Sequence, residues 1–368
     1  MKKEVLILTS ENPERPGGVE HLVRELARGL EARDYEVAVL HRANSLPPRL
    51  RTSANWLSRQ LSSLLLGFYV GREVRRRLHQ GVAALISNGP VGWLPIGLPN
   101  GSSCRQIHFY HGTYRGQADA IRPLISRPGY LKLKWWEAML FENCSGRRKL
   151  CLSNSDQTRD EVLRFFGHSA RTVWLPLDTA HFRPLQRSAC RREFRLQENA
   201  PVGLFVGSTH PQKGFPVVRS LTESLPHVSW LLAMRGDVPQ ELSAKHNVRV
   251  LPDAPYALLP RLYSAADFSV CPSRYESFGY AVAESLACGT PVIASPGGAS
   301  RLFLQRPPLD RLLIPDANDV SAFRAAVIDL LHDPTSYRSA IQSEVRPLLQ
   351  DLLAPENWWP RFLAVTGL

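Results

Sequence analysis

The sequence predicts an α/β protein built from two doubly wound domains. Its 368 residues suit two domains of ordinary size. Apolar runs typical of buried strands alternate with helical patterns in both halves, first at Val5–Leu8 and again at Val202–Gly207. A stretch with prolines at its ends, Pro176–Pro184, separates the halves. We therefore expect an N-terminal domain over residues 1–178, a C-terminal domain over 179–350, and a terminal helix over 351–368.

The composition is that of a globular protein with excess positive charge. Apolar residues make up 44% of the chain, and the formal net charge is +12. That charge implies an anionic partner, which could be nucleotide phosphates, acidic lipid or an acidic or phosphorylated glycan. The six cysteines have no metal-binding spacing, which predicts reduced thiols and a cytoplasmic protein. No apolar run approaches the roughly 18–20 residues of a membrane span.

The first strand, helix and strand form a βαβ unit. They are expected at Val5–Leu8, Val19–Leu30 and Tyr35–Leu40. The loop before the helix contains Gly17 and Gly18 but lacks the G-x-G-x-x-G fingerprint of dinucleotide-binding proteins. The sequence therefore argues against a dehydrogenase.

A second strand–turn–helix–strand unit carries two carboxylates. The strand Asp267–Cys271 leads into a turn with Glu276, and the helix Tyr280–Cys288 carries Glu284, eight positions further on. Open α/β sheets bind ligands at the carboxyl ends of their strands, where this turn would lie. Carboxylates at such a place can accept hydrogen bonds from sugar hydroxyls. The N–H groups at the helix N-terminus (Ser277, Phe278 and Gly279) would favour a phosphate.

The run from Pro272 to Ala294 resembles the E-x7-E signature of the retaining GT-B glycosyltransferases of family 4. The resemblance implies two Rossmann-like domains facing each other across a cleft, with the last helix crossing back to the first domain. It also implies transfer of a sugar from a UDP- or GDP-sugar to an acceptor hydroxyl, with retention of configuration. The acceptor would be a glycan, a glycolipid or a small molecule, in bacterial cell-surface glycan or glycolipid synthesis.

The same resemblance assigns roles to individual residues. Glu276 and His111 would be catalytic, with Glu276 on the donor sugar hydroxyls and His111 against the donor sugar. Glu284 would bind the ribose. No cofactor or metal is expected, because no Asp-x-Asp element ends a strand. The remaining donor-binding positions are Gly17, Gly18, Ser208, Lys213, Ser277, Phe278, Gly279 and Tyr280.

One departure from the family pattern concerns the diphosphate. Family members usually carry an arginine and a lysine in the loop after the first strand of the second domain. Here the lysine is Lys213, and Ser208 stands in the arginine's place. We hypothesise that Arg274 or Arg301, each just beyond a neighbouring strand end, supplies the missing cation, with Arg301 preferred; otherwise Ser208 donates one hydrogen bond and donor affinity is modest.

Two helical segments leave a choice of interpretation. The stretch Ala54–Leu78 predicts a helix with a basic end at Arg75, Arg76 and Arg77, and an apolar stripe of Leu57, Leu61, Leu64, Leu65 and Phe68. We interpret the stripe as sheet-covering; the arginines leave open a peripheral contact with an anionic membrane at its inner face. The helix Leu131–Cys144 carries adjacent Trp135 and Trp136, which cannot share one face, so one of them could lie at an interface.

Other functions stay open as alternatives. A GT-B-like nucleotide-sugar epimerase would use the same donor without an acceptor. A non-catalytic nucleotide-sugar-binding protein is disfavoured by the pattern of glutamates and Lys213. A nucleic-acid partner is suggested only by charge, and no nucleic-acid-binding motif is present, so none is expected.

Overall fold

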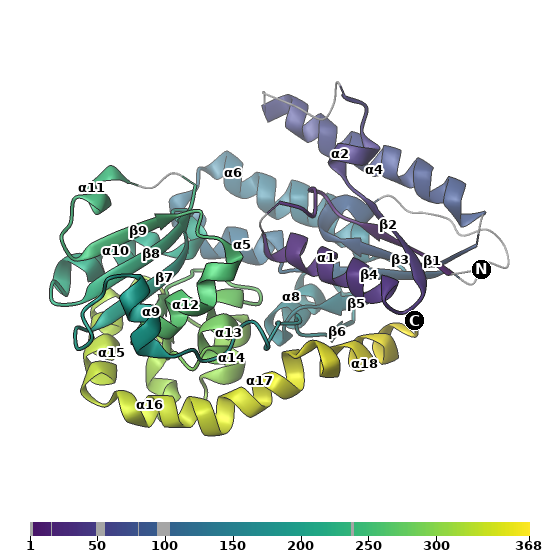
Figure 1. Cartoon of the computed structure of the whole chain (residues 1–368). Coiled ribbons are helices and arrows are strands. Elements are labelled where there is room, and N and C mark those ends of the chain that lie inside the picture. The colour runs from purple at the N-terminus through teal and green to yellow at the C-terminus, as the bar shows by residue number, and fades with distance from the viewer. Residues whose placement is uncertain (1–2, 16, 49–55, 80, 94–103, 237–238) are drawn as a thin grey trace. The chain divides into compact units, whose positions relative to one another are not determined.

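A computed structural model describes residues 3–15, 17–48, 56–79, 81–93, 104–236 and 239–368 of the chain (Figure 1). The chain divides into two compact units. Unit 1 contains Met1–Leu175 together with Trp359–Leu368, and unit 2 contains Pro176–Trp358. The division after Leu175 lies close to the expected boundary after residue 178. Each unit is built on its own parallel sheet.

The sheet of unit 1 has the strand order β2-β1-β3-β4-β5-β6, and every neighbouring pair is parallel. Its central strands are apolar and buried, as parallel strands covered by helices on both faces must be. The bounds are β1 Lys3–Leu8, β2 Tyr35–Leu40, β3 Val82–Asn88, β4 Arg105–Tyr110, β5 Leu150–Ser153 and β6 Ala170–Thr172.

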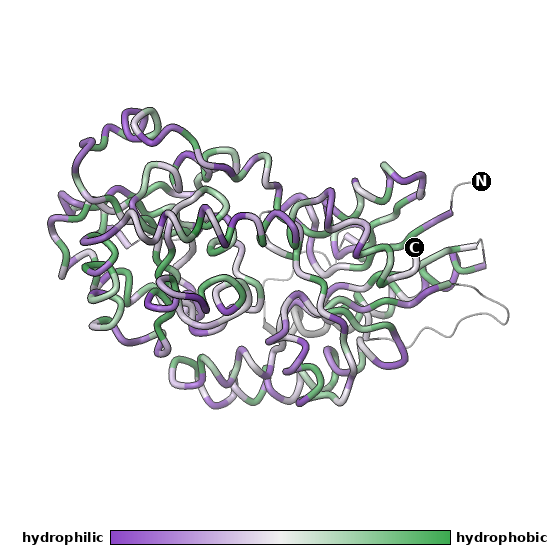
Figure 2. Tube along the Cα trace, turned by 90° about the horizontal axis from the view of Figure 1, so that it is seen from below, coloured by the Kyte–Doolittle hydropathy of each residue, from purple (hydrophilic) through white to green (hydrophobic). Residues whose placement is uncertain are grey.

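The helices of unit 1 connect these strands (Figure 1). The longer ones are amphipathic, and Figure 2 shows green and purple alternating along the helical traces. Their bounds are α1 Gly18–Glu31, α2 Arg42–Ser45, α4 Trp56–Leu78, η1 Gly89–Trp93, α5 Tyr114–Ala120, η2 Arg122–Leu124, α6 Arg127–Leu131, η3 Lys132–Glu142, α7 Asn143–Gly146 and α8 Asp156–Phe166.

Helix α4 packs on the sheet through a face that agrees only in part with the predicted stripe. Its buried side chains recur every four residues and join a core cluster with Leu6, Leu85 and Val91. The predicted stripe is confirmed at Leu65, which packs against this cluster, and is wrong at Phe68, which is 57% exposed. Leu57, Leu61 and Leu64 lie outside the described side chains, as do residues 54 and 55 entirely. Among the described side chains of α4, the buried members of the cluster are Leu66, Val70, Val74 and Leu78.

The segment expected as one α-helix over Leu131–Cys144 is a π-helix, η3, continuous with short α-turns on both sides. A π-helix is usually a local irregularity found at functional positions. Both tryptophans on it reach solvent, with Trp135 59% and Trp136 42% exposed. Neither therefore belongs to the core, and the expectation that one of them is available for an interface extends to both.

The C-terminal residues of the chain pack into unit 1. The Trp359 ring lies against Gly29 of α1, where a Cβ would overlap it, and beneath the Arg33 guanidinium at 4.4 Å. Arg105 donates to the carbonyl of Thr366 at 2.9 Å. These residues belong to helix α18 (Pro355–Thr366), which follows α17 (Arg346–Leu353).

The sheet of unit 2 has the order β11-β10-β7-β8-β9, again with all pairs parallel. The strands are β7 Val202–Ser208, β8 Ser229–Arg235, β9 Val248–Pro252, β10 Phe268–Cys271 and β11 Val292–Ala294. The helical elements are α9 Arg187–Glu193, η4 Pro211–Lys213, α10 Phe215–Ser224, α11 Gln240–Ser243, η5 Tyr256–Leu258, α12 Leu259–Ala265, α13 Tyr280–Ala287, α14 Gly298–Phe303, η6 Leu309–Leu312, α15 Val320–His332, α16 Pro334–Ala340 and η7 Ile341–Val345.

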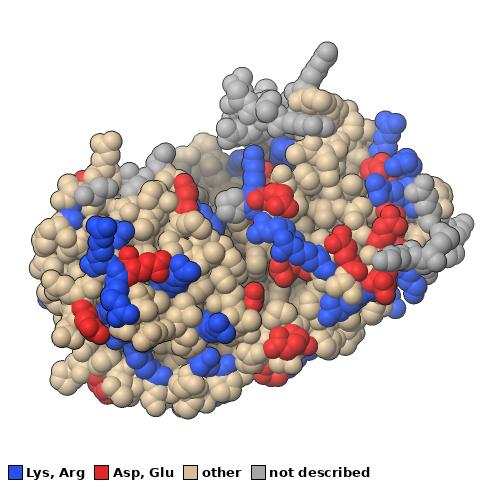
Figure 3. Space-filling view, viewed as in Figure 1, with Lys and Arg blue, Asp and Glu red and all other residues tan. Residues whose placement is uncertain are grey.

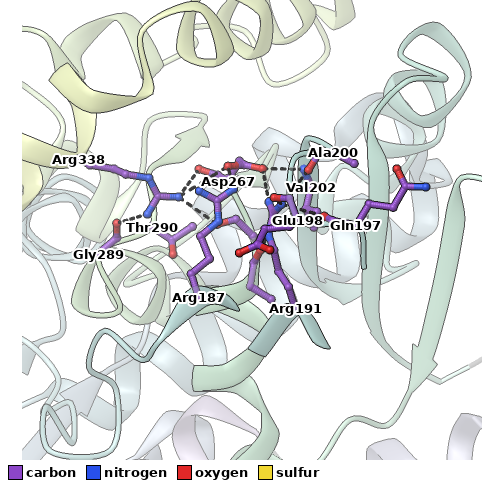
Figure 4. A network of polar contacts seen from close by, with 12 residues as sticks. Arg187, Arg191, Gln197, Glu198, Ala200, Val202, Asp267, Gly289, Thr290 and Arg338 are labelled. Atoms are coloured by element: carbon purple, nitrogen blue, oxygen red, sulfur yellow. Dashed lines mark hydrogen bonds and ion pairs between the residues drawn. The ribbon is translucent and has the colours of Figure 1, made fainter. Parts of the chain in front are cut away.

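A buried polar network ties α9 to the start of β10 in unit 2 (Figure 4). The Arg191 side chain, only 1% exposed as a residue, donates to Asp267 at 2.6 Å and to the carbonyls of Ala265 and Ala200 at 3.1 and 3.0 Å. The same carboxylate accepts the N–H of Val202 at 2.8 Å. A buried arginine is tolerated only when its donors are matched, and this one is matched by one carboxylate and several carbonyls.

One face of the molecule shows a mixed surface charge. On the face drawn in Figure 3, basic and acidic side chains are interspersed over both units. No helix in the described part of the chain is long and apolar enough to cross a membrane. On this face the net charge of +12 does not form a single basic patch, so individual basic residues are considered at the sites where they lie.

Candidate active site

The carboxyl edge of the unit 2 sheet holds two loops that are tied to each other. Gln212 in the loop after β7 donates to the carbonyl of Tyr275 in the loop after β10, at 2.8 Å. In return, the N–H of Arg274 reaches the carbonyl of Gln212 at 2.8 Å. Gly214 has a φ of +65°, and a Cβ there would overlap the Pro272 carbonyl, so this contact requires glycine.

This arrangement brings two predicted site residues together. The Lys213 Nζ lies 2.6 Å from the Glu276 Oε2, with side chains 35% and 17% exposed. The same carboxylate oxygen accepts the hydroxyl of buried Ser273 at 3.3 Å. Burial, the largest single cause, lowers the pKa of Lys213, but the negative charge of Glu276, the Cys271 thiol and the hydrogen bond to Glu276 together raise it by more, so the net shift is upward. Lys213 is therefore charged, and both side chains are partly open to solvent.

Two glycines, Gly279 and Gly297, allow the backbone to pack closely around Glu276. Gly279, the N-cap of α13, has a φ of +92°, and a Cβ there would lie 3.0 Å from the Glu276 Cγ. A Cβ at Gly297 would lie 2.7 Å from the Glu276 carbonyl oxygen. The glycines thus allow the loop after β10 and the start of α14 to pack closely around the carboxylate.

The other predicted residues of this turn lie at the start of α13. Phe278 is buried, its carbonyl accepts the N–H of Ala299 at 2.6 Å, and its ring lies 4.9 Å from that of Tyr280. Ser277 is partly exposed beside it, and the Tyr280 hydroxyl reaches the carbonyl of Pro176 at 3.3 Å. The turn is therefore fixed by packing, with its backbone at the N-terminus of an eight-residue helix.

Glu284 lies on α13, where its carboxylate is buried. Its Oε2 accepts the hydroxyl of Tyr263, on α12, at 2.9 Å. Burial raises the pKa of Glu284 to about 7, against the Tyr263 hydrogen bond and the positive charge of Arg235, which lower it. The group therefore changes charge near neutral pH. Tyr263 was not anticipated from the sequence, because only the packing of α12 against α13 brings it to Glu284.

The two arginines proposed to replace the missing cation differ in the surroundings of their side chains. The Arg274 guanidinium is held by the carbonyl of Pro211 at 2.6 Å and by the Asn318 Oδ1 at 2.8 Å. Arg301 lies exposed on α14. Ser208 ends β7, with its hydroxyl 3.4 Å from the N–H of His210. Among the described residues, these contacts of Arg274 and Ser208 bring no second cation to Lys213.

In unit 1, a hydrogen-bonded path crosses the carboxyl ends of three neighbouring strands. Asn88, at the end of β3, donates to the carbonyl of Leu8, at the end of β1, at 3.4 Å. Its Oδ1 lies 2.9 Å from the Nε2 of His111, which follows β4. Nε2 therefore carries the proton and donates to Asn88, leaving the lone pair on Nδ1, which has no partner among the described residues. Burial lowers the pKa of His111 to about 3, so the ring is neutral.

The loop after His111 is fixed by two carboxylates. The N–H of Tyr114 donates to Glu142 on η3 at 2.9 Å, and the hydroxyl of Thr113 donates to Glu161 on α8 at 2.5 Å. The π-helical segment thus orients the loop that carries His111. Elsewhere in unit 1, Gly17 caps α1 and Gly18 begins it, and a Cβ at Gly17 would overlap the carboxylate of Glu20.

Among the described residues, no group of three or more histidine, cysteine, aspartate or glutamate side chains is placed to hold a metal ion. The charged groups of the unit 2 site are Lys213, Glu276 and Glu284. A lysine beside a helix N-terminus suits an anion, and carboxylates suit hydroxyl donors. The fold and the site together suit a ligand that carries both an anionic group and hydroxyl groups.

Two family models match the chain in succession. Residues 16–180 match the model "Glycosyltransferase Family 4" and residues 186–346 match "Glycosyl transferases group 1". The two matches leave little of the chain uncovered and meet near the division between the units. The chain belongs to the family 4 glycosyltransferases and has the GT-B fold.

Individual relatives and solved structures agree with this. A D-inositol 3-phosphate glycosyltransferase of Thermobispora bispora is 32% identical over 185 residues, which cover 45% of this chain and 43% of the relative. The chain spans about half the length of the curated relatives it matches first, 43% and 48%.

Two solved structures share the fold over the whole chain. Sucrose-phosphate synthase from Thermosynechococcus elongatus superimposes with a TM-score of 0.78 at 20% identity, covering 100% of this chain and 98% of that one. The Anabaena protein HepE, solved with UDP and glucose, superimposes with a TM-score of 0.67 at 14% identity and covers 99% of each chain.

Proposed function

We propose that this protein transfers a sugar from a nucleotide-diphosphate-sugar to an acceptor hydroxyl, with retention of the anomeric configuration. The observation that carries the proposal is the pairing of Lys213 with Glu276 at the carboxyl edge of the unit 2 sheet. The pair offers a cation for a diphosphate and an anion for sugar hydroxyls within one hydrogen bond of each other. Glu284 adds a second acceptor on the next helix.

Each side chain has a chemical task in this reaction. Lys213 would stabilise the negative charge that develops on the departing diphosphate, which no metal is expected to do here. Glu276, released from Lys213 by the diphosphate, would accept hydrogen bonds from the donor sugar. Glu284 would accept from the ribose, and the unpartnered Nδ1 of His111 would accept from a sugar hydroxyl. Gly17 and Gly18 would let backbone approach the donor phosphates.

The relatives favour an anionic or surface-glycan acceptor. One curated relative is named for an inositol phosphate acceptor and another is an O-antigen chain mannosyltransferase of Escherichia coli. An acidic acceptor agrees with the net charge of +12. A role in bacterial cell-surface glycan or glycolipid synthesis follows as our proposal for the pathway class.

The test is a screen of UDP- and GDP-sugars by thermal shift, followed by product analysis with the donors that bind. A bound donor raises the apparent melting temperature by mass action. Transfer to an added acceptor, with the anomeric configuration read by NMR, supports the proposal. An epimerase would release free or epimerised sugar without an acceptor. Absence of any nucleotide-sugar binding would refute both functions.

We also propose a peripheral contact with an anionic membrane, made by unit 1 through the segment between α5 and α7. Nine large apolar side chains are well exposed in the described residues. Five of these lie within this one segment, which we call the aromatic segment: Leu124, Leu131, Trp135, Trp136 and Leu140. Exposed tryptophan and leucine beside basic residues are typical of an interfacial element. Arg122 and Arg127 supply basic charge here, whereas Lys132 and Lys134 lie in ion pairs with Glu137 and Asp119 at 3.5 and 3.8 Å.

The arginines at the end of α4 are less suited to this contact. Arg76 and Arg77 both pair with Glu73 at 2.7 Å, and Arg77 also pairs with Glu4 of β1 at 2.6 Å. Much of their charge is therefore satisfied within the unit. The hydrogen bonds from Arg76 and then Arg77 lower the pKa of Glu73 to about 2, so this compensation persists at any physiological pH.

A further inference from the structure

The carboxyl ends of β7 and β8 place an unassigned arginine next to Ser208. The strands are parallel, and the register pairs Ser208 directly with Arg235. Register partners in a parallel pair lie about 4.8 Å apart and project to the same face of the sheet. Arg235 therefore starts one strand away from the position at which family members carry their diphosphate-binding arginine, and on the same face.

We propose that Arg235 binds the diphosphate of the nucleotide-sugar donor and takes the place of the arginine that Ser208 lacks. The inference rests on the proposed function, since it assumes that a nucleoside diphosphate is bound. A guanidinium can form two parallel hydrogen bonds to phosphate oxygens, and its long side chain spans the distance between neighbouring strands. With Lys213 it would provide two positive charges from adjacent strand ends. Family members usually supply the same number from the single loop after the first strand of the second domain.

The electrostatics of the site agree with that position. The positive charge of Arg235 acts on two groups that belong to different loops. For Lys213, burial and then Glu276 dominate the pKa, and Arg235 lowers it further as a like charge. For Glu284, burial dominates, and Arg235 lowers the pKa as an opposite charge. The guanidinium therefore lies within electrostatic reach of both the diphosphate lysine and the ribose carboxylate.

Arg235 is also available for a ligand in a way that Arg274 is not. It is exposed, and no carboxylate among the described residues lies within ion-pair distance of it. Arg274 instead holds two loops together through Pro211 and Asn318. Removing Arg274 would disturb the loop of Lys213, whereas removing Arg235 would remove only a charge.

The test measures binding of UDP, GDP, UMP and GMP to the whole protein by calorimetry at pH 8. The variants are Arg235→Gln, the double variant Ser208→Arg with Arg235→Gln, and the control Arg219→Gln. Arg219 is an exposed arginine of the same unit on α10, paired with Glu223 at 3.5 Å and away from the strand ends. The melting temperature of each variant reports whether it still folds.

We expect Arg235→Gln to weaken binding of the preferred diphosphate at least about tenfold, with a smaller loss for its monophosphate. Ser208→Arg should restore most of that loss, and Arg219→Gln should bind as the parent does. Unchanged diphosphate binding in Arg235→Gln would overturn the inference alone. An equal loss for both nucleotides with a lowered melting temperature would overturn it too, by revealing a structural role. If the parent protein binds no nucleoside diphosphate, the proposed function fails as well.

Discussion

Lys213 and Glu276 form an ion pair whose nitrogen and oxygen atoms are 2.6 Å apart, although the two residues belong to different loops. The pair exists because Gln212, Arg274 and Gly214 fasten the loop after β7 to the loop after β10. The pair favours the charged form of Lys213, because the pKa of this lysine is lowered by burial but raised overall, mainly by Glu276. A diphosphate that binds Lys213 would compete with Glu276 for its ammonium group. Donor binding would therefore make the Glu276 carboxylate available to the hydroxyls of the donor sugar.

This relationship makes Glu276 the most informative position for catalysis. Glu276→Gln should reduce sugar transfer by at least about a hundredfold, because it keeps the shape and removes the charge. Stability should change little, since partly exposed ion pairs contribute about 0–1 kcal/mol. The measurement is turnover of a verified donor, with a thermal melt beside it. Full activity in a folded variant would show that the site has been assigned wrongly.

Lys213→Met should affect the donor more than any single arginine variant. It removes the cation next to the diphosphate and leaves Glu276 without its partner. We expect the KM for the donor to rise by more than the roughly tenfold change expected of a lost arginine contact. Steady-state kinetics with the donor varied at saturating acceptor measure this. A larger KM effect from Arg301→Ala than from Lys213→Met would restore Arg301 as the main diphosphate ligand.

The Asp267 network predicts a stability effect without a direct catalytic one. Asp267→Ala should cost about 3–5 kcal/mol of unfolding free energy, because it leaves the buried Arg191 guanidinium without its carboxylate. Equilibrium unfolding in urea measures the loss. Asp310→Ala, on the exposed turn η6, is the matched control and should change stability by less than about 0.5 kcal/mol. Equal stabilities of the two variants would contradict the structural role of the network.

The aromatic segment predicts binding to anionic vesicles. Replacing Trp135 and Trp136 by alanine should weaken vesicle binding strongly, because both rings are exposed and would enter the interface. Replacing Ile328, which is exposed on α15 of unit 2, should have no effect. Cosedimentation with vesicles of anionic and of zwitterionic lipid measures both.

The alternative is that the arginines of α4, and not the aromatic segment, make the contact with an anionic membrane. Replacing Arg75, Arg76 and Arg77 by glutamine tests the membrane-surface role first considered for that helix. If this change alone abolished salt-sensitive binding, the contact would lie on α4. Because Arg77 joins α4 to Glu4 of β1, the change should also lower stability slightly.

Much of the fold followed from the sequence because its signals are local. The strand β2 lies at the predicted Tyr35–Leu40, and helix α13 ends one residue before the expected Cys288. The apolar residues of Leu312–Pro315 predict a short strand, but the structure has only an isolated bridge there, from Leu313 to Ala294, after the turn η6. Whether such a short segment pairs as a strand depends on its tertiary contacts, which a pattern of a few residues does not contain.

The site was predicted unevenly for the same reason. Glu276 and Lys213 could be singled out from motifs, yet their ion pair depends on two loops meeting. Arg235 could not be singled out in the same way. The apolar run Val228–Ala233 predicts a strand that ends at Ala233, whereas β8 continues to Arg235. Tyr263 was missed because it lies on a separate helix from Glu284, and only the core joins them.

Glu284 predicts how donor binding depends on pH. Burial raises its pKa to about 7, from the ordinary carboxyl value of 4.5. A ribose hydroxyl bonds best to the ionised carboxylate, so nucleotide affinity should rise as the pH increases from 6 to 8. Uridine and guanosine, which carry no phosphate, are suitable probes because they do not titrate in that range. Glu284→Gln should remove the dependence and weaken nucleotide binding by roughly 1.5–3 kcal/mol at pH 8.

The same pKa has the opposite consequence for stability. Because the folded state holds the proton more tightly than the unfolded state, unfolding free energy falls as pH rises from about 4.5 to about 7 and is level above that. The loss of unfolding free energy over that range corresponds to about 3 kcal/mol. Glu284→Gln, which keeps an acceptor for Tyr263, should therefore be the more stable protein at pH 8 while binding nucleotide less well. A variant that lost stability and affinity together at pH 8 would show that Glu284 supports the core and not the ribose.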